Sequence, residues 1–358
     1  SELAPSPHPL ANAVAALASP AGGDATGVLE VLGFLSLGLV GWVAFRLGRE
    51  LFSAAVGAVF AAVLLTAPPL VDATLQAGLD VPFLGLVLWA MALEAQERGR
   101  AGPLVVLAVA GLLRPEAWLL AAVLVAVRAP GLDRRRLAGS VALAAAAPVV
   151  WVVSDLIATG DPLHSLHATR TLGGLIGAPA GTGEAVGQAP RFLRFFLADP
   201  VVWAGLAGLP LALWLRYREA LLPAAVLALG VGALAVLGVF GVPLSYRYGI
   251  VPAAMVALFA AVAVVGWTAM PRGAARSRWR AAGAAGVVAV LALSAPGVMD
   301  DLGLVTARAE SERARQGRLR EAVERPGAPR CVRVREFLRV PEVAFWGDVR
   351  PRCVTVGA

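Results

Sequence analysis

The residues best suited to chemistry stand inside an apolar run. The stretch GLLRPEAWLL, residues 111–120, holds Arg114, Pro115 and Glu116 between apolar side chains. Charged side chains at such places are costly to bury and are usually paired, wet or functional. Proline ends a helix because it lacks the backbone N–H and clashes with the preceding turn. We predict a backbone break at Pro115 with both charges beside it. The alternative is one long kinked helix in which Arg114 and Glu116 only pair with each other.

Two further stretches carry polar groups that can bind anions or orient other charges. Asp80 stands two residues before Pro82 and either orients a charged partner or caps the helix that starts there. The stretch SYRYG, residues 245–249, places Arg247 beside Tyr248. A guanidinium is a planar fork suited to phosphate, whereas tyrosines at such a place are also common at membrane interfaces.

The chain has three histidines, which are His8, His164 and His167. Histidine is a common metal ligand and titrates near neutral pH. His164 and His167 stand three apart, a spacing that puts both on one helical face. They are therefore candidates for holding a divalent metal. No carboxylate stands in register with them, so ordinary polar side chains are the alternative.

The composition is that of an integral membrane protein. The 358 residues are 58% hydrophobic and 15% charged, whereas soluble proteins carry about 25% charged residues. The mean hydropathy is +0.75. The net charge of +7 does not indicate a nucleic-acid partner, because the arginines stand in short loops between apolar runs. The sequence has no Walker loop, CxxC, HExxH or GxSxG motif, so nucleotide hydrolysis and serine or zinc hydrolase chemistry are not supported.

We expect an all-α, polytopic transmembrane helical bundle of about nine or ten membrane segments, some of half height. Residues 1–27 would be the remnant of an extracytoplasmic loop, 28–298 the transmembrane domain and 299–358 an extracytoplasmic tail. The segments are predicted at residues 28–45, 51–71, 81–95, 103–113, 116–128, 138–158, 199–215, 220–241, 249–269 and 281–298.

The C-terminal tail is expected to be a small α/β unit. Residues 302–325 are charged and helix-prone, and the later stretches VRVREFL and CVTV are typical of short strands. Cys331 and Cys353, the only cysteines, both fall in this tail. On the oxidising side of a membrane they would form a disulfide; two free thiols are the alternative.

The arginines predict how the chain is oriented in the cell membrane. Cytoplasmic loops carry an excess of arginine, and all five Arg-rich loops can share that side if residues 103–128 enter and leave on the same side. These 26 residues cover roughly 39 Å as a helix, too long for one ordinary span and too short for two full ones. Two half-height helices broken at Pro115 would fit, with Arg114 and Glu116 on the outer side.

Several of these stretches, in this order, resemble one family. They are FRLGRELFSAAVGAVFAAVLLTAPP (45–69), the Asp80-x-Pro82 element, GLLRPEAWLL, the GDPL loop and SYRYGIVPA (245–253). The last is similar to an Arg-x-x-x-x-Pro pattern of that family. The chain resembles integral-membrane glycosyltransferases of the C superfamily, in the branch of protein O-mannosyltransferases and aminoarabinose transferases. The resemblance covers most of residues 8–270.

The resemblance implies a function at the outer face of a bacterial cell membrane. Such enzymes take a sugar from a polyprenyl-phosphate carrier and pass it to a protein, lipid or glycan, without a nucleotide. By this resemblance Arg114, Arg247 and Tyr248 would bind the donor phosphate, and Asp80, Glu116 and His8 would support them. A divalent metal at His164 and His167 would fit the same face.

The family's catalytic Asp lies in an outer loop that precedes an element similar to His8-Pro9-Leu10. The catalytic base is therefore expected upstream of Ser1, which suggests an N-terminally truncated chain. A pseudoenzyme or scaffold without the base is one alternative. A lipid or small-molecule transporter is another, although the break at Pro115 has no counterpart in the second half of the sequence, as the repeats of many transporters would require.

Overall fold

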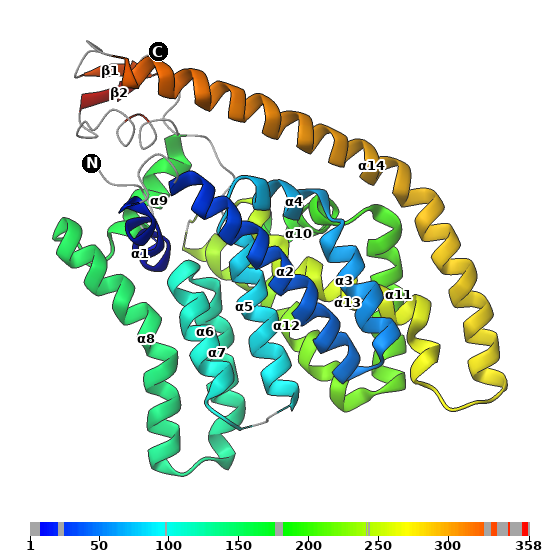
Figure 1. The fold of residues 1–358 in the computed structure, drawn as a ribbon. Helices are drawn as coiled ribbons and strands as arrows, with labels where there is room; N and C mark the ends of the chain where they lie inside the picture. The colour runs from blue at the N-terminus through cyan, green and yellow to red at the C-terminus, as the bar shows by residue number, and fades with distance from the viewer. Residues whose placement is uncertain are drawn as a thin grey trace.

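The computed structural model describes residues 8–20, 25–96, 99–175, 182–240, 242, 244–325, 331–334, 343 and 353–356. They form a bundle of helices whose long axes run in roughly the same direction (Figure 1). The expected all-α bundle is confirmed for this part of the chain.

In the first half of the bundle, one predicted membrane span, residues 51–71, is not a single helix. Residues 51–71 were predicted as a single segment, but two helices bent by 58° take their place. Ser53 caps the first of them by accepting a hydrogen bond from the Val56 N–H at 3.3 Å, and Pro68 and Pro69 start the second, where proline is favoured. The helices here are α1 (Pro9–Ala18), α2 (Ala25–Leu51), α3 (Ala54–Leu65), α4 (Pro68–Leu75) and α5 (Asp80–Gln96).

The predicted break at Pro115 is confirmed. Helix α6 (Gly102–Leu113) ends just before it and α7 (Glu116–Arg128) begins just after it. The two short helices lie side by side and run in opposite directions (Figure 1). Arg114 and Pro115 therefore sit at a turn, not in the middle of one kinked helix.

The second half follows the predicted order with two additions that the hydropathy did not indicate, α9 and α10. Its elements are η2 (Ala129–Gly131), α8 (Arg134–Thr159), α9 (His164–Leu175), α10 (Thr182–Phe196), α11 (Asp199–Leu215), α12 (Tyr217–Val239), η3 (Tyr246–Gly249), α13 (Ile250–Val265), η4 (Gly266–Ala269) and α14 (Ala274–Glu324).

Helix α13 is the central element of the bundle. Almost all of its residues are buried, and α11 crosses it closely because Gly208 has no side chain. A Cβ at Gly208 would lie 1.9 Å from the Phe259 carbonyl oxygen. Small residues allow such close packing between membrane helices.

Fewer helices meet the length of a membrane span than expected. Five helices of the described part are long and apolar enough, or up to seven if each bent pair counts as one span. The difference lies in short helices such as α5, α6 and α7, which have 17, 12 and 13 residues. The structure is that of a multi-pass membrane protein in which several segments are of half height.

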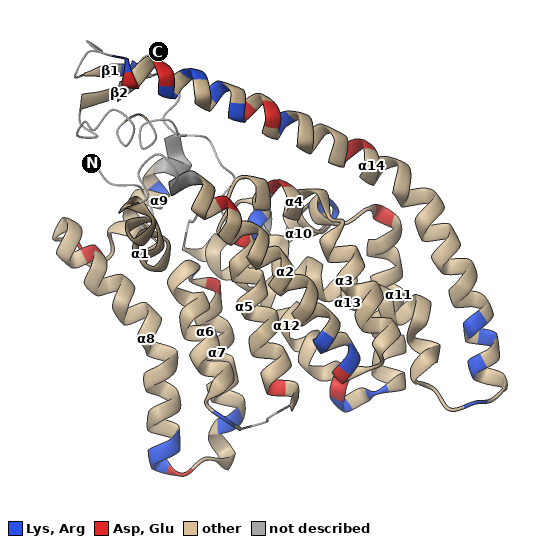
Figure 2. Ribbon diagram, in the orientation of Figure 1, with Lys and Arg blue, Asp and Glu red and all other residues tan. Residues whose placement is uncertain are grey.

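The Arg-rich loops lie at the same end of the bundle (Figure 2). Arg216, between α11 and α12, donates a hydrogen bond at 3.3 Å to the Leu51 carbonyl at the end of α2. Arg128, at the end of α7, donates one at 2.9 Å to the Arg100 carbonyl before α6. This arrangement agrees with the expectation that these loops share one side of the membrane.

Helix α14 continues far beyond its apolar part. It has 51 residues, or about 76 Å at 1.5 Å per residue, and its outer half extends over the opposite end of the bundle from the Arg-rich loops (Figure 1). The expected boundary at residue 299 falls within this helix. A small α/β tail is not supported. The described residues beyond α14 show only a three-residue parallel pair, β1 (Val332–Val334) with β2 (Val354–Val356).

Candidate functional site

The break between α6 and α7 is held by two tryptophans. Pro115 has no N–H to bond the carbonyl four residues earlier, which is that of Gly111. The indole N–H groups of Trp118 and Trp151 donate to this carbonyl instead, at 3.0 and 2.9 Å. A Cβ at Gly111 would lie 2.8 Å from the Trp118 ring and from the Ala147 Cβ. Glycine is therefore needed where the two indoles converge.

Arg114 is the centre of a buried ion cluster at this break. Its backbone is extended, with φ −150° and ψ 134°, and the residue is only 3% exposed. One terminal nitrogen of the guanidinium donates to Asp80 Oδ1, and the other donates to Glu116 Oε1 at 2.5 Å. The group also lies over the rings of Phe83 and Tyr248, 5.1 and 5.4 Å from their centroids. The paired carboxylates compensate for the burial of the cation.

The cluster brings together residues that are distant in the sequence. Asp80 is the first residue of α5, and Tyr248 belongs to η3. The alternative in which Arg114 pairs only with Glu116 is therefore wrong. The alternative that Asp80 only caps a helix is also incomplete, because its carboxylate binds Arg114.

His8 joins the cluster from the N-terminal end of the described chain. Its ring packs edge-on against Trp151, with centroids 5.5 Å apart. Burial lowers the pKa of His8, and the nearby guanidinium groups of Arg247 and Arg114 lower it further, against the raising effects of the Leu113 backbone and of Glu116. The imidazole is thus neutral at pH 7. Its Nδ1 is buried and has no hydrogen-bond partner in the described structure.

Arg247 differs from Arg114 in being available. Both terminal nitrogens of Arg114 are taken by carboxylates, whereas Arg247 is exposed and makes no ion pair with any other described residue. The two cations therefore have different capacities. The guanidinium of Arg114 is bound by two carboxylates, whereas that of Arg247 has the planar form suited to an anion.

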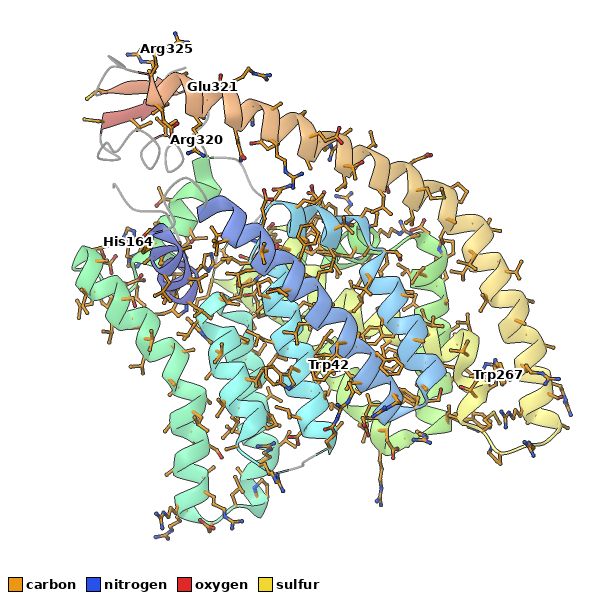
Figure 3. The ribbon with its side chains drawn as sticks, viewed as in Figure 1. Trp42, His164, Trp267, Arg320, Glu321 and Arg325 are labelled. Carbon is orange, nitrogen blue, oxygen red and sulfur yellow. The ribbon has the colours of Figure 1, made fainter. Side chains whose placement is uncertain are left out.

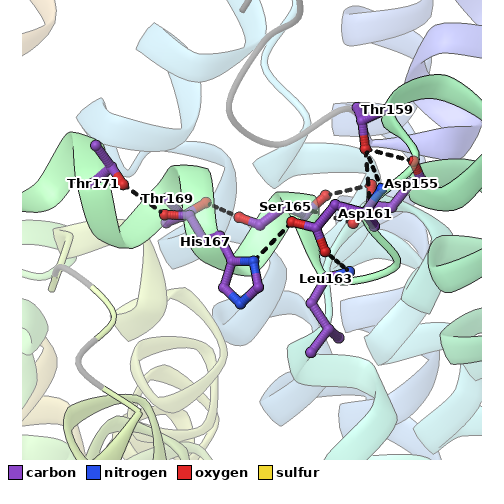
Figure 4. Close-up of polar contacts among 8 residues, drawn as sticks. All are labelled: Asp155, Thr159, Asp161, Leu163, Ser165, His167, Thr169 and Thr171. Atoms are coloured by element: carbon purple, nitrogen blue, oxygen red, sulfur yellow. Dashed lines mark hydrogen bonds and ion pairs between the residues drawn. The ribbon is translucent and has the colours of Figure 1, made fainter.

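His164 and His167 lie apart from this cluster. His167 Nδ1 is 2.8 Å from Asp161 Oδ2 (Figure 4), and the Leu163 N–H and His167 lower the pKa of Asp161. His164 lies near α1 (Figure 3), and its Nε2 is buried without a partner among the described residues. No group of three His, Cys, Asp or Glu side chains that could hold a metal occurs in the part of the chain that the structure describes.

One buried acid near these histidines was not singled out from the sequence. Asp155 is 3% exposed and accepts hydrogen bonds at 2.8 Å from both the N–H and the hydroxyl of Ser165 (Figure 4). It therefore fixes the start of α9 against the end of α8. The signal was present, because Asp155 is the one charge in the apolar run that ends α8.

An apolar groove leads away from the cluster. A small cavity of about 20 Å³, lined by Phe83, Glu116 and Tyr248, shares Leu120 and Leu229 with a cavity of about 370 Å³ between α5, α7 and α12. The small cavity reaches Leu237 and the larger one reaches Arg218, at the Arg-rich end. These two positions of α12 are about 28 Å apart at 1.5 Å per residue. The residues that line the two cavities thus extend over nearly the roughly 30 Å of a bilayer core.

The comparisons with known proteins support the fold. No protein-family model and no curated protein sequence matches the chain. Among solved structures, the chain is similar to the crystal structure of ArnT from Cupriavidus metallidurans in the apo state, with a TM-score of 0.55 and 16% sequence identity. The alignment covers 94% of this chain and 73% of that chain. At this identity the likeness shows the fold alone.

Proposed function

We propose that this protein transfers a sugar from a polyprenyl-phosphate donor to an acceptor at the outer face of the cell membrane. The observation that carries the proposal is the connection between the Arg114 cluster and the membrane-deep apolar groove. A ligand that fills both has a charged head and a long apolar chain. The fold shared with ArnT supports this proposal but does not identify the sugar.

The orientation follows from the arginines. If the Arg-rich end of the bundle faces the cytoplasm, the break at Pro115 and the outer half of α14 face the other side. The C-terminal tail is then extracytoplasmic. A polyprenyl chain would extend from the outer site toward the cytoplasmic leaflet.

The donor phosphate would bind at Arg247, with Arg114 and Tyr248 beside it. In this proposal Arg114 acts mainly through its contacts, because it holds two carboxylates and a tyrosine ring in place. Arg247 supplies the charge that stabilises the leaving phosphate as its negative charge develops. Neutral His8 adds no further cation to this group.

The reaction would be a displacement at the anomeric carbon. The acceptor hydroxyl attacks this carbon, the bond from carbon to the phosphate oxygen breaks, and the polyprenyl phosphate leaves. The hydroxyl proton needs a base. Asp80 and Glu116 both bind Arg114, so they support the cation, and no described residue is assigned as this base.

A divalent metal at His164 and His167 would require their contacts to change. His167 already bonds Asp161, so a metal would need that bond to open or a third ligand from elsewhere. The proposed transfer uses the chain's own cations at the phosphate and no nucleotide.

The test separates binding from transfer. The chain would be reconstituted in nanodiscs and titrated with undecaprenyl phosphate and with undecaprenol, which has the same chain without the phosphate. We expect the phosphate to bind more tightly, and Arg247→Ala to lose about tenfold in its affinity, as expected for one charge-assisted hydrogen bond. Arg191→Ala, an exposed arginine on α10, is the matched control. Equal affinity for the two lipids, or equal affinity in wild type and Arg247→Ala, would contradict the proposal.

A further inference from the structure

A second and larger cavity lies between α14 and the outer ends of α2 and α4. Its volume is about 860 Å³, within the range of small-molecule sites. Most of the residues that line it have polar side chains, which are four arginines of α14 with Glu30, Asp72, Gln76, Ser311, Glu312 and Gln316. Leu29, Leu75 and Ala309 supply apolar patches on the same wall.

The charges of this cavity largely cancel. Arg313 Nη2 is 3.4 Å from Glu30 Oε2, which joins α14 to α2 across the cavity. Arg315 is 2.9 Å from Glu312 along α14. Two guanidinium groups, of Arg308 and Arg318, and the carboxylate of Asp72 make no ion pair with other described residues.

This mixture suits a ligand rich in hydroxyl groups. A hydroxyl both donates and accepts, so an array of hydroxyls is matched by carboxylates that accept and by guanidinium and amide groups that donate. The Asp72 carboxylate would repel a phosphate, and Arg308 and Arg318 would repel an ammonium group. Apolar patches such as Leu75 fit the carbon face of a sugar ring.

The cavity lies next to the proposed transfer site. Ala77, in its wall, is three residues before Asp80, so the chain between them spans at most about 11 Å. Ala77 has φ 51°, in the left-handed region that a residue with a side chain rarely adopts. Such strain persists only where the surroundings fix the backbone. The turn from α4 to α5 therefore joins the cavity wall to the carboxylate that binds Arg114.

A neighbouring cavity adjoins the 860 Å³ cavity and extends toward the membrane-spanning part of α14. It has a volume of about 570 Å³, and it shares Asp72 and Arg308 with the larger one. Its wall includes Leu293 and Val298, from the apolar part of α14. The two cavities thus adjoin along α14, and the second one extends to the apolar part of this helix.

We infer that the cavity beneath α14 binds the carbohydrate part of the acceptor. That the bound carbohydrate is the acceptor rests on the proposed sugar transfer. That the cavity binds a carbohydrate rests only on the residues that line it. The hydroxyls of the acceptor bind Asp72, Gln76 and Arg318, and one of them reaches past Ala77 toward Asp80.

The test measures binding, not transfer. The full chain in nanodiscs would be applied to a panel of neutral mannose and arabinose oligosaccharides and, separately, titrated with undecaprenyl phosphate. We expect binding of at least one oligosaccharide. Its affinity should fall about tenfold in Asp72→Leu and in Arg318→Leu, the loss expected for one hydrogen bond to a charged group. Glu321→Leu and Arg325→Leu, at the far end of α14 (Figure 3), are the controls.

Each outcome decides something. Undecaprenyl phosphate binding without any oligosaccharide binding would overturn this inference and leave the donor site standing. Oligosaccharide binding that survives both cavity variants would also overturn it. Phosphatidylglycerol would be titrated in the same way, and an affinity for it that is lost in both variants, with no oligosaccharide bound, would assign the cavity to an acidic lipid instead. Oligosaccharide binding that depends on the cavity, without undecaprenyl phosphate binding, would keep the carbohydrate site and refute the transfer.

Discussion

Replacing Arg114 by alanine removes the cation that two carboxylates share. Arg114 is 3% exposed and donates to Asp80 and Glu116. Removing one partner of a buried ion pair costs about 3–5 kcal/mol, because the remaining charge is left without compensation. Asp80 keeps 26% of its side chain exposed, which favours the lower end, and the lost ring contacts add about 1 kcal/mol. We expect Arg114→Ala to lower the free energy of unfolding by about 4 kcal/mol.

A triple variant shows whether the isolated charges cause this loss. Asp80→Asn and Glu116→Gln, added to Arg114→Ala, leave no uncompensated carboxylate at the break. We expect the triple variant to recover about half of the lost stability, since neutral polar groups are cheaper to bury than charges. The measurement is equilibrium unfolding in mixed micelles, followed by circular dichroism, for wild type, the single variant and the triple variant.

Two results would refute the reasoning. If Arg114→Ala lowers the free energy of unfolding by less than about 1 kcal/mol, the ion pairs of Arg114 would contribute no more than exposed ion pairs do. A triple variant no more stable than the single one would mean that packing, and not charge, holds the break. Sugar transfer by the folded triple variant at the wild-type rate would show that Arg114 acts only on stability.

Three further predictions concern other parts of the molecule. Gly111→Ala should lower the free energy of unfolding, measured in the same micelles, by about 1–3 kcal/mol, because its Cβ would overlap an indole ring. Gly139→Ala, with nothing within 4 Å of its Cβ, should not destabilise the protein in that measurement. The pKa of His8 is lowered from 6.5 by burial, so its contribution to stability is present above pH 6.5 and is lost as the pH falls. His8→Asn should make the melting temperature depend less on pH between pH 7 and 5. The same pH dependence in the variant and in wild type would contradict this. Cys331 and Cys353 are free thiols in the structure, with Sγ atoms 2.7 Å apart. We still predict that protein from the oxidising side carries them as a disulfide that resists alkylation until a reductant is added; two alkylated thiols without reductant would refute the disulfide.

Local chemistry made part of the site predictable. The break at Pro115 follows from one residue that cannot donate a hydrogen bond, and the structure places it there. The arginines in the loops predicted that Asp80, Arg114 and Tyr248 lie on the same side of the membrane. Their contact did not, because residues 34 and 134 positions apart meet only through the packing of four helices.

Other features were missed for identifiable reasons. Hydropathy treats residues 51–71 as one run, although Pro68 and Pro69 mark the start of a second helix. Hydropathy also ends a span where charges begin, so the continuation of α14 past residue 298 was expected as a separate tail. A helix needs no apolar residues to continue, and the charged residues after Asp301 favour helix as well as those before it.

The length of α14 has a mechanical consequence. One wall of the large cavity is this helix alone, and the apolar half of the helix is scarcely buried by the bundle. Pro296, within α14, removes one backbone hydrogen bond and is a point where a helix bends. Membrane helices adjust their tilt to the thickness of the bilayer. Because the two halves of α14 are one helix, we expect a change of tilt in the lipid to reach the wall of the cavity as far as the helix does not bend at Pro296.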